Sequence, residues 1–594
     1  MSLFPSRRRP GFHAGDDLQA GIAVRLDGVR SVALETGRSR LLATALMFVV
    51  VFSTLALRLI DVTLFDRGTG TEAGARGGRN GGVEMARADV TDRNGVLLAS
   101  SLPTVSLFAR PDDLRSARAD PVEAAARLNQ VLPELDVAET AALLSSARQF
   151  VYLRRNLTPR QYQDVNALGI PGLQFEKGEI RIYPHGPLVS HVVGMTDIDN
   201  IGIAGIEKRF ETALRDDHRP LTLSLDIRVQ TIVRDQLLRA VEEFKAIGGT
   251  GMVMDVRSGE LLAMVSLPDF DPNDPPPGTD PALFNRATKG AYEMGSTFKL
   301  FNTALALESG RITLNSSFDA TKPLVFAGRV IHDDHAQNRW MTVPEILIHS
   351  SNIGSARMAL EVGTEAQRAF LGRIGMLAPP SIELPEVGAP LVPNPWREIN
   401  TITIAFGHGL SVTPLQLLSG TATLINGGEY HPPTLLAHSS GEVGPGFRVV
   451  KPTTSAQMRQ LMRMVVTEGT GKKADVPGYL VGGKTGTAEK AGHGGYRRKA
   501  VLASFIAAFP MDEPRYAVLI MIDEPQATRE TFGFISAGWT AAPAAGRVIA
   551  QIAPLLGLIP KPATPPPPLA GRGRDGRPAT ATTQPGGHEV AVFD

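Results

Sequence analysis

The feature that most restricts how this chain can fold is one apolar run near its amino terminus. Residues 41–57, "LLATALMFVVVFSTLAL", contain no charged side chain, and two further apolar residues follow at 59 and 60. About 20 apolar residues in a helix are enough to cross a bilayer. A cleaved signal peptide is the alternative, but the 40 residues before the run exceed the length of a usual signal-peptide leader. We therefore expect one uncleaved transmembrane helix at residues 41–60.

The segments beside this run differ from it in composition. Residues 1–40 hold seven arginines and four acidic residues, and basic flanks remain in the cytoplasm, which predicts a cytoplasmic basic tail. Residues 61–84 are rich in glycine and predict a flexible linker. Residues 558–594 are rich in proline and glycine and predict a disordered tail. Two globular domains, at residues 85–219 and 220–557, are expected to lie between linker and tail.

Composition excludes several classes of site. The chain has 594 residues, so it should hold more than one domain. Its net charge of +1 gives no sign of a nucleic-acid partner, and it contains no cysteine. Disulfides and cysteine-based metal or redox sites are therefore excluded.

Local patterns predict the main elements of both domains. A strand, an Asn94-Gly95 turn and a second strand are expected in "RADVTDRNGVLLAS" at 87–100. Apolar residues at helical spacing follow Asp226, an acidic residue suited to a helix cap. The remaining expectations are helices near 121–131 and 159–168, a β-hairpin at 251–266, and strands at 502–509 and 515–522.

A serine and a lysine in an apolar stretch are the first candidates for chemistry. The stretch is "GSTFKLF" at 295–301, and Lys299 is the only one of 13 lysines with a serine three residues before it. If Ser296 opens a helix, Lys299 lies about one turn further on the same face. Burial lowers the pKa of a lysine, and a neutral amine can activate a hydroxyl as a nucleophile. On these residues alone, a helix cap followed by a surface lysine remains an alternative.

Two later stretches could complete such a site. Ser350 and Asn352 lie in "HSSNIGS" at 349–355, and Lys484, Thr485 and Gly486 lie in "GGKTGTAEK" at 482–490. Lysine and threonine offer donors to an anion, and glycine lets a substrate backbone approach closely. Taken singly, the first stretch could be an ordinary helix cap and the second an exposed strand end.

Together the three motifs resemble the signature of penicillin-binding proteins and serine β-lactamases. They occur in the order Ser-x-x-Lys, Ser-x-Asn and Lys-Thr-Gly. The stretches at 284–301, 404–417 and 481–490 resemble the transpeptidase domain of class B enzymes, and those at 87–100 and 202–211 resemble the pedestal domain that precedes it. "FGHGL" at 406–410 and "ISAGWTAAPAAGRVI" at 535–549 resemble the division-specific FtsI type.

This resemblance implies a fold. It is an α+β transpeptidase domain, an antiparallel sheet flanked by helices, at residues 220–557. An elongated mixed α/β pedestal at residues 85–219 and one membrane helix precede it.

The resemblance also implies a reaction and a role for each residue. Ser296 would attack the carbonyl between the two terminal D-alanines of a peptidoglycan stem peptide. Lys299 would be the base, Ser350 would relay the proton and Asn352 would bind the substrate amide. Lys484, Thr485 and Thr487 would hold the terminal carboxylate, beside Gly486. The N–H groups of Ser296 and Thr487 would form the oxyanion hole. We expect cationic Lys484 to disfavour the charged form of Lys299.

Partners and location follow from the same resemblance. We expect stem peptides and β-lactams as ligands, the inner membrane as anchor and the septum as location, with the catalytic domain in the periplasm. FtsW, FtsQ, FtsL, FtsB and FtsN would be the protein partners. The rival hypotheses are an elongation-type transpeptidase, a D,D-carboxypeptidase or β-lactamase, a β-lactam sensor on the same fold, and a structural member of a membrane complex whose catalysis is dispensable. The complete set of motif residues argues against an inactive enzyme.

Two further motifs are set aside. "EGTGKKAD" at 468–475 lacks the first glycine of a phosphate-binding loop, and Lys473 stands where serine or threonine should follow the lysine. "HDDH" at 332–335 could bind a metal, but we expect a solvated polar turn. No metal and no cofactor are therefore predicted.

Overall fold

The computed structural model describes residues 46–50, 52–54, 86–438, 444–492 and 495–561. Compact units are found at Met1–Glu84 and Met85–Asp594. In the first unit, residues 46–50 and 52–54 are helical, and Leu46, Met47, Phe48, Val49, Val50 and Phe52 are all more than half exposed. Within the described residues, no helix is both long and apolar enough to cross a bilayer. Most of the predicted membrane helix, the basic tail, the linker and residues 562–594 lie outside the described residues.

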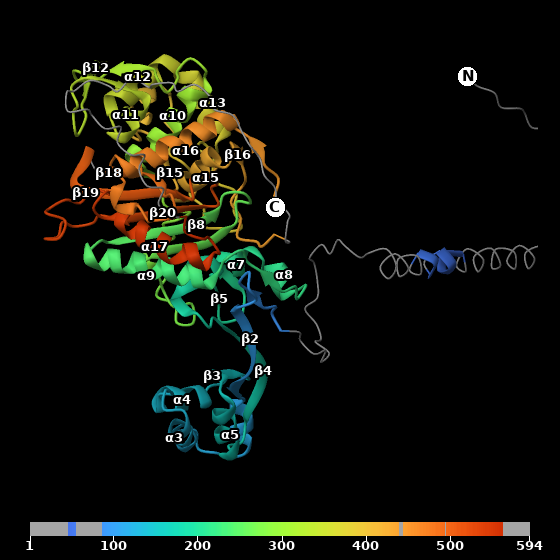
Figure 1. The fold of residues 1–594 in the computed structure, drawn as a ribbon. Coiled ribbons are helices and arrows are strands. Elements are labelled where there is room, and N and C mark those ends of the chain that lie inside the picture. Colours follow the sequence, from blue (N-terminus) through green and yellow to red (C-terminus); the bar gives the residue numbers. More distant parts are fainter. Residues whose placement is uncertain (1–45, 51, 55–85, 439–443, 493–494, 562–594) are drawn as a thin grey trace, which may run out of the picture. The chain divides into compact units, whose positions relative to one another are not determined.

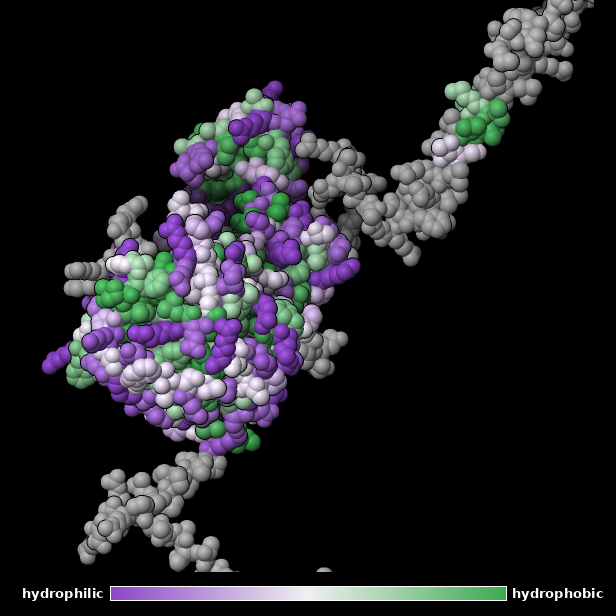
Figure 2. Space-filling model, turned by 90° about the horizontal axis from the view of Figure 1, so that it is seen from above, coloured by the Kyte–Doolittle hydropathy of each residue, from purple (hydrophilic) through white to green (hydrophobic). Residues whose placement is uncertain are grey.

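Apolar side chains mark the described part of the first unit. In Figure 2, residues 46–50 and 52–54 form the small green and white group on the otherwise grey stretch of chain.

The pedestal, expected at residues 85–219, is built around long antiparallel strands (Figure 1), and its sheet continues into a short strand just beyond residue 219. Its sheet has the order β3-β2-β1-β7, and β4 also pairs with β2. The elements are β1 (Val90–Thr91), β2 (Leu97–Ala109), α2 (Pro111–Ser116), α3 (Pro121–Val131), α4 (Val137–Leu144), β3 (Val151–Leu157), α5 (Pro159–Ala167), β4 (Leu173–Ile182), η2 (Gly186–Val189), α6 (Ser190–Val193), β5 (Met195–Thr196), β6 (Gly202–Ala204), α7 (Gly205–Arg209), α8 (Glu211–Arg215) and β7 (Leu221–Thr222).

Local signals explain where the pedestal elements begin. Gly95 has a φ of +80° in the turn between β1 and β2, as the Asn-Gly pair predicts. Asp120 and Thr158 accept backbone N–H bonds at the starts of α3 and α5, and a proline follows each of them. Both predicted helices are confirmed.

A five-stranded antiparallel sheet of order β18-β19-β20-β8-β9 forms the centre of the second domain. Its strands are β8 (Gly248–Asp255), β9 (Leu261–Leu267), β18 (Gly482–Gly492), β19 (Gly495–Phe509) and β20 (Tyr516–Asp523). The predicted hairpin and both predicted strands are confirmed. Alternate residues of β19 face opposite cores, because Ile506 and Ala508 pack in one cluster and Phe505 and Ala507 in the other. Both faces are therefore covered.

Helices cover each face (Figure 1). Helices α9 (Ile227–Glu243) and α17 (Ala541–Leu555) pack on one face, and Asp226 caps α9 as predicted. The other helices are α10 (Lys299–Glu308), α11 (Val343–Ile348), α12 (Asn352–Val362), α13 (Thr364–Arg373), α14 (Glu398–Ile404), α15 (Pro414–Ile425) and α16 (Pro452–Thr467). This arrangement confirms the predicted α+β class and leaves β18 as an edge strand.

Short elements complete the domain. They are η3 (Pro281–Leu283), β10 (Tyr292–Glu293), η4 (Gly295–Phe298), β11 (Ser317–Asp319), β12 (Leu324–Phe326), β13 (Arg329–Ile331), β14 (Trp340–Thr342), β15 (Ser411–Val412), β16 (Glu429–Tyr430), β17 (Phe447–Arg448) and η5 (Lys472–Ala474). Of these, η4 matters most for the site, because it carries Ser296 against the edge of β18.

Candidate active site

Ser296 lies in the tight turn η4, directly before helix α10. The preceding Gly295 has a φ of +54°, and a Cβ there would lie 2.8 Å from the carbonyl oxygen of Thr487. The N–H of Gly295 donates to the carbonyl of Gly407 at 3.2 Å. The "FGHGL" stretch therefore holds the turn that carries Ser296 through this backbone hydrogen bond. Backbone N–H groups in a first helical turn have no intrahelical acceptor, so that of Ser296 is available to an oxyanion.

Lys299 begins α10 and is completely buried. Its Nζ lies within hydrogen-bond distance of four oxygens: Ser296 Oγ at 2.9 Å, Ser350 Oγ at 3.1 Å, the carbonyl oxygen of Ser350 at 2.6 Å and Asn352 Oδ1 at 2.7 Å. Burial lowers the pKa of Lys299 to about 7, although the charges of Asp333 and Asp334 act in the opposite direction. A surface lysine after a helix cap is thereby excluded.

Ser350 lies between α11 and α12 with a φ of +58°, a conformation that costs a residue other than glycine of order 1–3 kcal/mol. This backbone turns both its carbonyl and its hydroxyl towards Lys299. The helix cap is the next residue, since Ser351 Oγ accepts from the N–H of Gly354 at 2.9 Å. The helix-cap alternative is therefore correct for Ser351, whereas Ser350 and Asn352 contact Lys299.

Lys484 reaches the same serine from the edge strand β18. Its Nζ donates to Ser350 Oγ at 3.0 Å and to the carbonyl of Thr485 at 3.1 Å, and its side chain is completely buried. Burial, and then the charge of Lys299, lower the pKa of Lys484 well below its usual range. We expected the charge of Lys484 to lower the pKa of Lys299, but the depressed pKa of Lys299 follows from burial.

Gly486 and Thr487 continue β18 beside the serine turn. A Cβ on Gly486 would lie 2.6 Å from the carbonyl oxygen of Met294, so the absent side chain is required by the approach of the serine turn itself. Thr487 is exposed, and its Oγ1 accepts from the N–H of Ala537 at 3.1 Å. The sequence predicts that Gly486 lets a substrate backbone approach closely, but it gives no signal of this contact with Met294.

Asp333 is a residue of the site that the motifs missed. Its carboxylate accepts from Ser351 Oγ at 2.7 Å and from the N–H of Ile353 at 2.9 Å, while the carbonyl of His332 accepts from Asn352 Nδ2 at 2.9 Å. The predicted solvated polar turn is confirmed for His332, Asp334 and His335, which are exposed, whereas Asp333 is half-buried and contacts the Ser-x-Asn motif. No group of three or more metal-binding side chains occurs in the described residues. No local sequence signal marks Asp333, because it lies 18 residues before the serine that it contacts.

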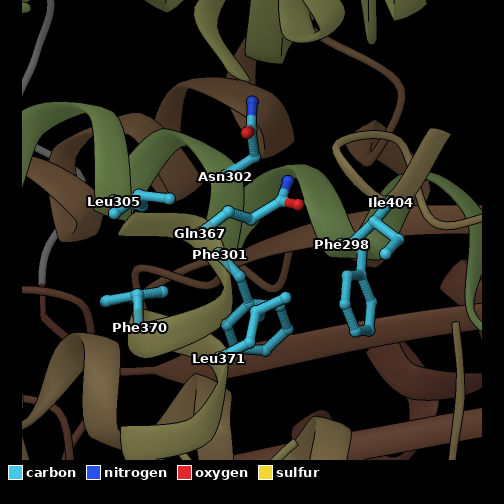
Figure 3. A pocket seen from close by; sticks show the side chains of 8 residues that line it. All are labelled: Phe298, Phe301, Asn302, Leu305, Gln367, Phe370, Leu371 and Ile404. Atoms are coloured by element: carbon cyan, nitrogen blue, oxygen red, sulfur yellow. The ribbon is translucent and has the colours of Figure 1, made fainter. Parts of the chain in front are cut away.

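A small cavity lies in the helical core, lined in part by Phe298 of η4 (Figure 3). Its lining is mostly apolar and consists of Phe298, Phe301, Asn302, Leu305, Gln367, Phe370, Leu371 and Ile404. The space open to the centre of a water molecule is about 10 Å³, enough for about one water. None of the predicted site residues lines it. It is a packing defect of the helical core and lacks the volume for a substrate.

Comparison with known families identifies both domains. The family described as "Penicillin binding protein transpeptidase domain" matches residues 249–544. The family described as "Penicillin-binding Protein dimerisation domain" matches residues 83–219. These matches confirm the resemblance that the three motifs carried.

Similar proteins span most of the chain. The "Probable peptidoglycan D,D-transpeptidase FtsI" of Caulobacter vibrioides is 41% identical over 502 residues, covering 82% of this chain and 84% of its own. The Escherichia coli (strain K12) "Peptidoglycan D,D-transpeptidase FtsI" is 31% identical over 485 residues, covering 77% and 82%. A crystal structure of penicillin-binding protein 3 from Mycobacterium tuberculosis, complexed with aztreonam, has the same fold with a TM-score of 0.63 at 24% identity, covering 80% of this chain and 97% of that one.

Proposed function

This chain belongs to the class B penicillin-binding proteins of the FtsI type and is a peptidoglycan D,D-transpeptidase of septal wall synthesis, and we propose that Ser296 is its nucleophile. The observation that carries this proposal is one continuous chain of hydrogen bonds. Ser296 Oγ contacts Lys299, Lys299 contacts Ser350 Oγ, and Ser350 Oγ contacts Lys484. A nucleophile within hydrogen-bond reach of an oriented base is the arrangement that acyl transfer needs.

In acylation, Ser296 Oγ attacks the carbonyl carbon between the terminal D-alanines. Lys299, whose pKa is about 7, takes the hydroxyl proton in its neutral form. The C–N bond breaks, and Ser350 passes a proton to the departing amine of D-alanine. The oxyanion of the intermediate accepts from the N–H groups of Ser296 and Thr487, and such a donor contributes about 3–4 kcal/mol. The product is an ester on Ser296, which the amine of a second stem peptide converts into the cross-linking amide.

Asn352 orients both the base and the substrate. Its Oδ1 accepts from Lys299 and one Nδ2 hydrogen is given to His332. An amide nitrogen carries two hydrogens, so the second is available for the carbonyl of the substrate amide. Lys484, Thr485 and Thr487 hold the terminal carboxylate, whose negative charge favours the protonated form of Lys484.

The test is covalent labelling by a fluorescent penicillin. Wild type should be labelled on the peptide that contains Ser296, and Ser296→Ala should not be labelled. The matched control is Ser309→Ala, just after the other end of α10, where the hydroxyl donates to the carbonyl of Ala306 and accepts from the N–H of Arg311. Labelling of Ser296→Ala on the same peptide would contradict the proposal.

The apolar run also supports an anchoring role. We propose that residues 41–60 cross the inner membrane once, with the amino terminus in the cytoplasm and the catalytic domain in the periplasm. We further propose that this helix and the pedestal dock on FtsW and on FtsQ, FtsL, FtsB and FtsN. Residues 41–60 would be exchanged for an unrelated membrane helix of equal length. Normal septal localisation and growth would contradict docking, whereas a labelled but misplaced enzyme would support it.

A further inference from the structure

Two loops contact the hydroxyl groups of β18 from outside the motifs. Thr470, in the loop after α16, lies 2.6 Å from Thr485, measured between the two Oγ1 atoms. Ala537, in the loop before α17, donates its N–H to Thr487 Oγ1 at 3.1 Å. Thr485 and Thr487 are two residues apart, so they lie on the same face of the strand. Each of these hydroxyls therefore has a fixed neighbour.

A hydroxyl carries one proton and two acceptor positions. At Thr487 the direction of the bond is certain, because a backbone N–H only donates. Thr487 thus keeps its own proton for another acceptor. Between Thr470 and Thr485 either oxygen can donate. If Thr470 donates, Thr485 also keeps its proton, and both strand hydroxyls offer a donor.

Thr470 is held where it can do this. The N–H groups of Gly469 and Gly471, on either side of it, both donate to the carbonyl of Val465 at 3.1 Å. Its own carbonyl lies 3.0 Å from the position that a Cβ on Gly538 would occupy, so the two loops touch. Sequence reasoning weighed the "EGTGKKAD" stretch only as a phosphate loop. The structure places it against the Lys-Thr-Gly strand.

We propose that Thr470 is a positioning residue that donates its hydroxyl proton to Thr485, so that Thr485 and Thr487 both present donors to the terminal carboxylate. This inference rests on the proposed function of Thr485 and Thr487. The consequence of this arrangement is that the site should prefer a substrate with a free carboxylate over one with a carboxamide. A free carboxylate supplies two acceptor oxygens, whereas a carboxamide supplies one and a nitrogen that needs an acceptor. Hydrogen bonds in series also strengthen one another.

The experiment uses two thioester substrates that differ only at the end that the strand binds. Benzoyl-D-alanyl thioglycolate carries a free carboxylate and benzoyl-D-alanyl thioglycolamide carries a carboxamide. The kcat/KM for each is measured with the full-length protein, and the ratio is the selectivity. Thr470→Val should lower this ratio about tenfold, as expected for loss of one oriented hydrogen bond, while Thr470→Ser stays within about twofold. The control is Thr467→Val on the same segment, whose hydroxyl only bonds backbone carbonyls of its own helix.

Thr485→Val separates the inference from the function on which it rests. If Thr485→Val lowers the ratio but Thr470→Val does not, Thr470 has no positioning role. Equal losses of kcat/KM on both substrates in Thr470→Val would show that it only supports the fold, and would likewise overturn the inference. If Thr485→Val leaves the ratio unchanged, the carboxylate role of Thr485 itself is wrong. Should Thr470→Val lose its thermal transition, Thr470→Ala against Thr470→Ser gives the same comparison.

Discussion

Buried basic side chains in the described part of the chain form one cluster in the pedestal, around Arg87, and another beside Ser296, around Lys299. In the pedestal, Arg87 and Arg181 both donate to the carboxylate of Glu207 at 2.7 Å, and Arg87 also contacts Glu211 at 2.8 Å. All of the acceptors of Lys299 and Lys484 in the described part of the chain are neutral oxygens. The first cluster is paired and the second is not.

The pKa values move in opposite directions for this reason. Burial works against the charged form of Arg87, but Glu207 and Glu211 outweigh it and raise its pKa. At Lys299 and Lys484 burial prevails and both pKa values fall. A buried charge with a partner stabilises a structure only if the partner stays, whereas a buried amine without a carboxylate partner is a base prepared for proton transfer. Burial therefore disfavours the charged form in both clusters. Carboxylate partners offset this effect at Arg87, whereas at Lys299 and Lys484 it prevails.

The largest expected effect tests the unpaired cluster. Lys299→Met should slow acylation by benzylpenicillin by about 10²–10⁴-fold, because the general base is lost. Its stability should match or exceed that of wild type near pH 7, since an amine without a carboxylate partner has been removed.

The stability of this variant should also depend on pH differently from that of wild type. Between about pH 7, the pKa of Lys299 in the folded chain, and the ordinary lysine pKa of 10.5, the unfolded wild-type chain binds more protons than the folded one. Wild-type stability relative to the variant should therefore rise with pH across that window, as urea unfolding measures. A strongly destabilised variant would contradict the contrast.

The paired cluster should behave in the opposite way. Glu207→Gln leaves Arg87 and Arg181 charged and buried, which should lower the unfolding free energy by about 3–5 kcal/mol. The acylation rate of the folded protein should change little. The matched control is Asp199→Asn, which breaks the exposed pair with Arg155 and should cost under about 1 kcal/mol. Equal urea midpoints for the two variants would show that the pedestal cluster carries no special stability.

The smallest expected effect concerns the surroundings of Lys299. The acylation rate should rise about tenfold per pH unit below about 7 and level off above it, because the neutral amine is the base. Asp333→Asn removes a charge that raises the pKa of Lys299, so the midpoint of this profile should move to lower pH. Asp334→Asn is the matched control, since it removes a similar charge but no contact to Ser351 or Ile353. Only Asp333→Asn should also lower the plateau, by a few-fold. Equal plateaus would contradict the positioning role of Asp333.

The amino-acid sequence by itself named the candidate site residues and determined much of the secondary structure. Proline and cap residues start α3, α5 and α9 where the pattern places them, because such signals act within a few covalently linked residues. The continuous apolar runs of β19 and β20 likewise indicate strands buried on both faces. The three motifs named Ser296, Lys299, Ser350, Asn352 and Lys484 through residue type and order alone.

Only the tertiary structure decided what those residues can do. The pKa of Lys299 depends on complete burial, which arises when α10, the Ser-x-Asn turn and β18 pack together. The left-handed backbone of Ser350 has no signal in its residue type. Asp333 and Thr470 act on residues 18 and 15 positions away in the sequence. Burial and through-space hydrogen bonds are properties of packed elements, so no local pattern could have specified them.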